Sequence, residues 1–127
     1  MATGRDKHRA HQAAVAGLGR HLSRRARNQC ELCETSKALK VVEIEPTFEH
    51  PDVKRAILIC ESCQTALKGD ISNPNTLRFL ESVVWSTTLP VQVAAVRMLR
   101  TLSDNGATWA TDCLDGLFLD PEIEALI

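Results

Sequence analysis

The first helical pattern in the chain lies at its N-terminal end. Alanine is frequent between residues 8 and 27, and apolar residues recur there at i, i+3 and i+7, which places them on one face of a helix. These residues are Val15, Leu18 and Leu22. Gly17 and Gly19 weaken the pattern by about 1 kcal/mol each relative to alanine. The pattern therefore predicts a helix within residues 1–27, with two weak points near its middle.

Two short apolar runs with the character of β-strands follow. The alternation in residues 41–45, Val-Val-Glu-Ile-Glu, predicts a strand that ends at Pro46. Residues 57–59, Ile-Leu-Ile, predict a second strand that leads directly into Cys60. Because the turn sequence His50-Pro51-Asp52 separates the two runs, we expect them to form a short β-hairpin.

The pattern after the second strand is helical. Residues 63–68 predict one or two helical turns that end at Gly69, and residues 73–127 predict a helical subdomain that begins with a cap at Asn73. Three apolar faces support the subdomain: Leu77, Leu80 and Val84; Val91, Ala95, Met98 and Leu102; and Trp109, Cys113 and Leu117. The predicted fold class is therefore α+β, with a short hairpin, an N-terminal helix and a C-terminal helical subdomain.

Four cysteines add a metal site to these elements. They form two pairs of equal spacing, Cys30 with Cys33 and Cys60 with Cys63, and 26 residues separate the pairs. A hairpin that brings the pairs together offers the tetrahedral sulfur environment that Zn²⁺ prefers. We expect a structural four-cysteine zinc site in a module of residues 28–69, built as a zinc ribbon or a treble clef. An iron centre, a disulfide and redox chemistry are the alternatives.

Composition limits the classes of protein that fit. A chain of 127 residues suits one domain, or a small domain with a helical companion. No stretch approaches the roughly 18 apolar residues of a membrane span, and no secretory apolar run follows the N-terminus, so we expect a cytoplasmic protein. Thiols stay reduced in the cytoplasm, which favours metal binding over disulfides. Aromatic residues make up only 4% of the chain, which argues against a base-stacking platform.

The charge is unevenly distributed although the net charge is only −1. Residues 1–29 contain seven lysines and arginines but only one acidic residue, Asp6. A stripe of Arg20, Arg24 and Arg27, together with Arg25, predicts a surface that contacts the phosphate backbone of a nucleic acid without reading its sequence. The alternatives are that these arginines pack against acidic side chains of the chain or lie in solvent.

His50 and Cys113 are the other candidates for chemistry. HNH-type nucleases carry a catalytic histidine on the strand after their first zinc knuckle, but only nine residues separate His50 from Cys60 and none of them is asparagine. We therefore expect His50 to be a solvated loop residue, and the histidines of the basic arm, at positions 8, 11 and 21, to be surface groups. Cys113 lies on a predicted apolar face, which favours an inert core thiol.

From about residue 23 onward the chain resembles the bacterial PhnA-like family, zinc-ribbon proteins named for alkylphosphonate utilisation. The resemblance rests on residues 28–33 (Asn-Gln-Cys-Glu-Leu-Cys), 41–46, 58–63, 85–86, 90–93 and 109–120. It implies zinc at the four paired cysteines and a helical tail that packs on the ribbon, and it implies no catalytic residues. Members often have glycine after the first knuckle, where this chain has Glu34.

These observations favour a non-catalytic zinc-binding protein that contacts a macromolecular partner, either a nucleic acid or a protein. One alternative is a hydrolase-type enzyme that acts on phosphonates or, as HNH nucleases do, on nucleic acid. Another is a structural homo-oligomer that associates through apolar residues of the helical tail. Those residues are Val83, Val84, Trp85, Leu89, Val91 and Val93.

Overall fold

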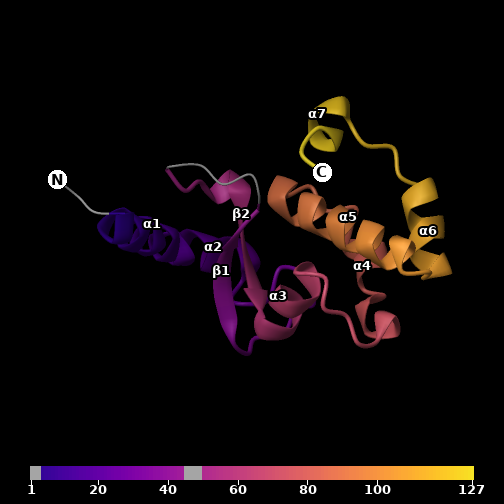
Figure 1. Cartoon of the computed structure of the whole chain (residues 1–127), viewed down its shortest axis with the longest axis horizontal. Helices are drawn as coiled ribbons and strands as arrows, with labels where there is room; N and C mark the ends of the chain where they lie inside the picture. Colours follow the sequence, from indigo (N-terminus) through magenta and orange to yellow (C-terminus); the bar gives the residue numbers. More distant parts are fainter. Residues whose placement is uncertain (1–3, 45–49) are drawn as a thin grey trace. The chain divides into compact units, whose positions relative to one another are not determined.

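A computed structural model describes residues 4–44 and 50–127 of the chain (Figure 1). The chain divides into two compact units, residues 1–61 and residues 62–127. The expected end of the first strand at Glu45 and Pro46 lies outside the described residues. None of the helices within the described ranges has the length and apolar character needed to cross a lipid bilayer.

The N-terminal helical region of the first unit consists of two helices rather than one. Helix α1 spans Gly4–Gly17 and α2 spans Gly19–Ala26, with a turn at Leu18 between them. The break falls between the two glycines that weaken the sequence pattern, because glycine has the lowest helix propensity after proline. Helix α2 ends where Arg27 and Asn28 both adopt positive φ, and the Asn28 N–H donates to the Ser23 carbonyl.

The predicted hairpin is present as a two-stranded antiparallel sheet. Strand β1 spans Leu39–Glu43, β2 spans Ala56–Cys60, and their register pairs Leu39 with Cys60 and Glu43 with Ala56. The short 3-10 helix η1, Val53–Arg55, leads into β2. The pairing continues one residue beyond β1, because the Ile44 N–H donates to the carbonyl of Arg55 at 2.7 Å.

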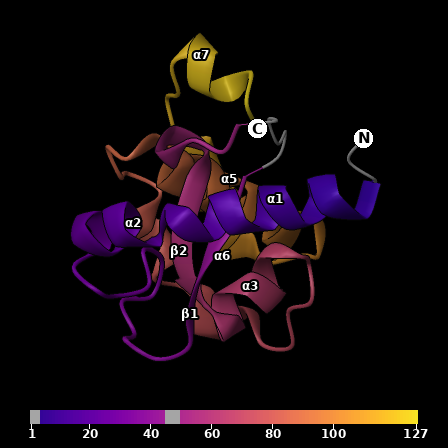
Figure 2. The same cartoon turned by 90° about the vertical axis from the view of Figure 1, so that its left-hand side faces the viewer.

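A small apolar core joins the helices to the hairpin. Leu22 of α2 is fully buried against Ala56 and Leu58 of β2. Partly buried apolar side chains surround this centre: Leu18, Ala26, Leu39, Val41 and Val53. Helices α1 and α2 thus lie across one face of the hairpin (Figure 2), and the apolar stripe seen in the sequence at Leu18 and Leu22 faces the strands.

The second unit is helical, as the sequence predicts. After α3 (Glu61–Leu67) the chain contains η2 (Pro74–Leu77), α4 (Leu80–Val83), α5 (Leu89–Asp104), α6 (Thr108–Asp115) and α7 (Pro121–Glu124). Helix α5 is the central element and contacts both α4 and α6. Its buried residues include the whole predicted face, Val91, Ala95, Met98 and Leu102, and also residues beside that face, such as Val93 and Leu99.

Helix α6 differs from its predicted packing. Ala110 is its only buried residue, whereas Trp109 and Cys113 are partly exposed. The expectation that Cys113 is a core thiol is therefore wrong, because α6 turns the small side chain of Ala110 inward instead. Partial burial raises the pKa of the Cys113 thiol, and the negative charge of Glu81 raises it further, so this thiol stays protonated at neutral pH.

Most of the apolar residues considered for self-association are at least partly buried in the chain. Val84, Val91 and Val93 are at most 4% exposed. Trp85 is 58% exposed and is the exception in that set. Phe118, in the segment between α6 and α7, is 92% exposed. Single exposed apolar side chains are common on protein surfaces and do not by themselves indicate an interface.

Candidate metal centre

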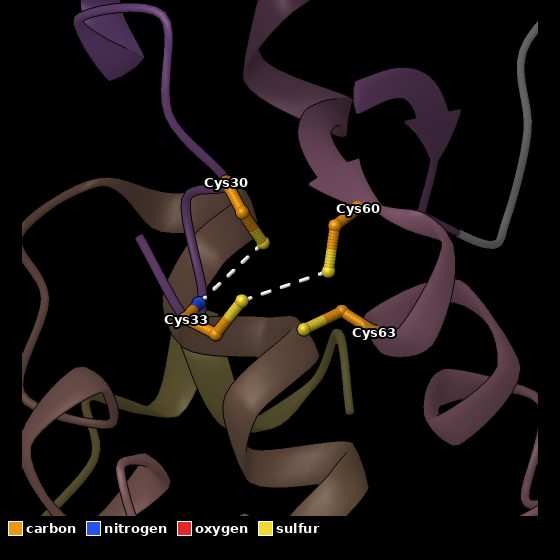
Figure 3. A group of neighbouring side chains, drawn as sticks. All are labelled: Cys30, Cys33, Cys60 and Cys63. Carbon is orange, nitrogen blue, oxygen red and sulfur yellow. Dashed lines mark hydrogen bonds between the residues drawn. The ribbon is translucent and has the colours of Figure 1, made fainter. Parts of the chain in front are cut away.

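The four paired cysteines lie together. Cys30 and Cys33 precede β1, Cys60 ends β2, and Cys63 lies in the first turn of α3. Their sulfur atoms all lie within 4.8 Å of one another, and the four side chains point toward a common centre (Figure 3). Cys30, Cys60 and Cys63 are buried, and Cys33 is partly exposed. Such a group could hold a metal ion, and the spacing of the two pairs predicts it.

The sulfur spacing suits one ion rather than a disulfide. Four sulfurs at about 2.3 Å from a tetrahedral ion lie about 3.8 Å apart, which is compatible with the 4.8 Å limit of the cluster. The Cys33 and Cys60 sulfurs are 3.5 Å apart, far longer than the roughly 2.05 Å of an S–S bond. None of the four cysteines forms a disulfide.

The first cysteine pair forms a tight turn around the Cys30 sulfur. The backbone N–H groups of Leu32 and Cys33 both point at Cys30 Sγ, each with a nitrogen–sulfur distance of 3.4 Å. The turn closes as the Cys30 N–H donates to the Thr35 carbonyl at 2.7 Å, and Glu34 adopts a φ of 70°. Donors aimed at a sulfur stabilise its thiolate form, which is the form that binds a metal.

Glu31, between the two cysteines of this pair, attaches the turn to the outer edge of β2. Its N–H donates to the Leu58 carbonyl at 2.8 Å, and its carboxylate accepts from the Leu58 N–H at 2.9 Å. One residue thus satisfies both backbone groups that Leu58 presents on the side away from β1. The contact fixes the first pair beside the strand that carries Cys60.

Arg25 of α2 completes the same edge. Its guanidinium forms a two-pronged ion pair with Glu31, with nitrogen–oxygen distances of 2.8 and 2.7 Å. It also donates to the carbonyls of Val53 and Ala56, both at 2.8 Å. Arginine suits this position because its planar fork can serve a carboxylate and two carbonyls at once. The network joins α2, the first cysteine pair and β2.

Arg25, which the arginine stripe predicts to contact nucleic acid, is thus engaged within the protein, and the role of Glu31 was not predicted. The sequence does contain a signal for this pairing. Glu31 lies between two cysteines of a predicted metal site, so its carboxylate adds negative charge at a place where a cationic side chain is expected to compensate for it. The other three arginines of the stripe, Arg20, Arg24 and Arg27, are exposed. His50 is also exposed, at the turn before η1.

The protonation of the cluster opposes metal binding at low pH. Burial raises the pKa of the Cys33 thiol from 9.0 to about 11, and the neighbouring sulfurs of Cys60 and Cys30 add to the shift, whereas a backbone hydrogen bond at Thr35 opposes it. Without an ion, Cys33 therefore keeps its proton at neutral pH. A bound metal must displace that proton, so metal binding to this cluster releases protons and strengthens as pH rises.

Comparison of the chain with known proteins does not assign a function to this cysteine cluster. No family model, curated protein or solved structure matches the chain. The resemblance to PhnA-like proteins thus stays a prediction from the sequence. The assignment of the site depends on the cluster's own donor set and spacing.

Replacing Arg25 tests the network at the edge of β2. In Arg25→Gln the Glu31 side chain, only 6% exposed, keeps its charge and loses its partner, so the metal-loaded protein should lose about 3 kcal/mol of unfolding free energy. Urea unfolding measures the loss. The control Arg24→Gln, at an exposed position of the same helix, should change stability by at most about 0.5 kcal/mol. Equal effects of the two substitutions would contradict the structural role of Arg25.

Glu34 offers a test of the turn itself. A non-glycine residue with a φ of 70° is strained, so Glu34→Gly should raise the midpoint of thermal unfolding, by an amount equivalent to about 1 kcal/mol. Glu34→Ala removes the same charge but keeps the strain, and it should bring no such gain. Lys37→Gly, at a nearby exposed position with negative φ, should lower stability because glycine only adds freedom to the unfolded chain. A gain in Glu34→Ala equal to that in Glu34→Gly would assign the effect to charge instead.

Proposed function

We propose that residues 28–69 form a structural four-cysteine zinc module of the treble-clef type. The observation that carries this proposal is the convergence of four sulfurs from two cysteine pairs. The order of elements supports a treble clef: a cysteine turn comes first, a hairpin follows, and the second pair opens helix α3. A two-stranded hairpin is marginally stable in water, so an ion that joins its ends adds stability that the sheet lacks.

Zinc fits the donor set best among the candidate ions. Four thiolates in a tetrahedral arrangement are its common structural environment, and zinc has no redox chemistry that would disturb the fold. A single iron ion accepts the same ligands and is the alternative. Because four sulfurs occupy all positions of a tetrahedral ion, no position is left for a catalytic water, which supports a structural role over a hydrolytic one.

The resemblance to PhnA-like proteins is part of the same proposal. Its motifs include both cysteine pairs and extend through the helical region to residue 120. From this resemblance we infer a fold and a bound metal ion, but no activity on carbon–phosphorus bonds.

We further propose that helix α2, which precedes the module, presents a basic surface to nucleic acid. Arg20, Arg24 and Arg27 are exposed, whereas Arg25 is engaged with Glu31 and the edge of β2. The contact set therefore contains three arginines rather than four, with Arg25 holding the helix that carries the others. Exposed guanidinium groups suit phosphate oxygens, and they bind the backbone without selecting a sequence.

A salt series tests this surface. The metal-loaded protein should bind labelled RNA or DNA with an affinity that falls steeply between about 50 and 200 mM salt, because phosphate contacts release counterions. Replacing Arg20, Arg24 and Arg27 with glutamine should reduce the slope of log affinity against log salt by about 0.9 for each lost contact on duplex DNA. Fluorescence anisotropy measures both quantities.

A charge-matched control separates local contact from net charge. Lys37, Lys40 and Lys68 are exposed and lie in the metal module, so their replacement by glutamine removes the same three charges. This variant should keep the original slope. If both triple variants bind alike, or if the unaltered protein does not bind at low salt, the arginine surface is not a nucleic-acid interface.

A further inference from the structure

An open hollow of about 560 Å³ lies between one face of α1 and the turn that begins at His50. Among the described residues, the polar ones that line it are Lys7, His8, His11 and His50. The other described residues of the lining are small and apolar, namely Ala10, Ala14 and Pro51. All of these residues belong to the first unit. The metal centre and the arginine stripe do not use any of them.

The hollow owes its form to two features of α1. Ala10 and Ala14 are one helical turn apart and leave space where longer side chains would fill it. His11, one residue along, is held in place because its Nε2 lies 2.6 Å from the Glu43 carboxylate of β1. This contact ties the helix to the hairpin and fixes one imidazole at the wall of the hollow.

The chemistry of the lining favours an oxyanion. A lysine ammonium group offers three donors, and an imidazole ring offers at least one N–H whether it is neutral or protonated. Among the described residues that line the hollow none is a carboxylate, and Glu43, the acid next to it, is engaged with His11. Phosphate oxygens are strong acceptors for donors of this kind, and hydrogen bonds from charged donors are the stronger ones.

A metal ion fits this lining less well. Among the described residues, the four cysteines are the group of histidine, cysteine and acidic side chains that converge closely enough to hold an ion. The three histidines of the hollow do not converge in this way, and Lys7 would repel a cation. The donors are instead spread around the hollow, as contacts to several oxygens of a larger anion require.

We propose that this hollow binds a phosphate group, and that its occupant is a backbone phosphate of the nucleic acid contacted by the arginines of α2. The proposal rests on the proposed function and deepens it, because it adds a second, histidine-based contact on the neighbouring helix. Helix α1 leads directly into α2, so two consecutive helices carry most of the lining of the hollow and the arginine stripe. The open form of the hollow suits a phosphate that stays part of a chain.

The test uses the histidine rings as reporters in the zinc-loaded full-length protein. Ring ¹⁵N–¹H correlation spectra are recorded during titration first with inorganic phosphate, against a chloride control of equal ionic strength, and then with single-stranded oligothymidylate. Resonances of His8, His11 and His50 should shift with both ligands. His21, an exposed histidine of α2 outside the hollow, should not shift with inorganic phosphate.

Two variants complete the test. His8→Gln with His50→Gln should weaken oligonucleotide binding about tenfold, equivalent to one charge-assisted hydrogen bond, whereas His21→Gln should not change it. Both altered histidines are exposed, and circular dichroism of each variant is used to check that the fold is kept. An oligonucleotide that binds through the arginines without moving His8 or His50 overturns this inference and leaves the proposed function intact. Phosphate shifts at the hollow without any oligonucleotide binding support an anion site but overturn both the nucleic-acid function and the proposed occupant.

Discussion

The ion pair between Arg25 and Glu31 is the interaction on which the first unit depends. The outer edge of β2 presents the carbonyls of Ala56 and Leu58 and the N–H of Leu58, and these two side chains, with the Glu31 backbone, satisfy all three. An open strand edge is normally a liability, and here it is closed without a third strand. Because Glu31 stands between Cys30 and Cys33, closing the edge also places the first cysteine pair.

The ion pair of Arg25 with Glu31 also places a positive charge beside the candidate metal centre. Four thiolates around a divalent ion would leave a formal charge of about −2, and Glu31 adds another negative group next to the cysteines. Arg25 supplies the opposite charge at 2.7 Å from the carboxylate. Arg25 thus serves the interior of the module, and the other arginines of the stripe stay available for an external anion.

The position of the basic helices follows from apolar packing rather than from charge. Leu22 of α2 packs against the strands, so the side of the helix that carries the exposed arginines must face away from the hairpin. The contact between His11 and Glu43 holds α1 against β1 in the same way. The residues of α1 and α2 that pack against the hairpin therefore determine where the proposed phosphate contacts of both helices lie.

Local patterns in the sequence predict much of this structure. The spacing of Cys30, Cys33, Cys60 and Cys63 predicts that they lie together. Alternating apolar residues, many of them β-branched, predict the hairpin. Both signals can be recognised because they lie within short stretches of the chain. The Arg25–Glu31 network could not be predicted in this way, since its carbonyl partners at Val53 and Ala56 lie 28 and 31 residues away along the chain. The inward face of α6 was also missed, because Ala110 gives a weaker apolar signal than Trp109 or Cys113.

X-ray absorption spectroscopy at the zinc edge tests whether the four cysteines bind a single zinc ion, as we propose. We expect zinc as the metal of the purified protein, with four sulfur neighbours at about 2.3 Å and no second metal nearby. Nitrogen or oxygen neighbours in place of sulfur, or a protein that binds no metal at all, would contradict it.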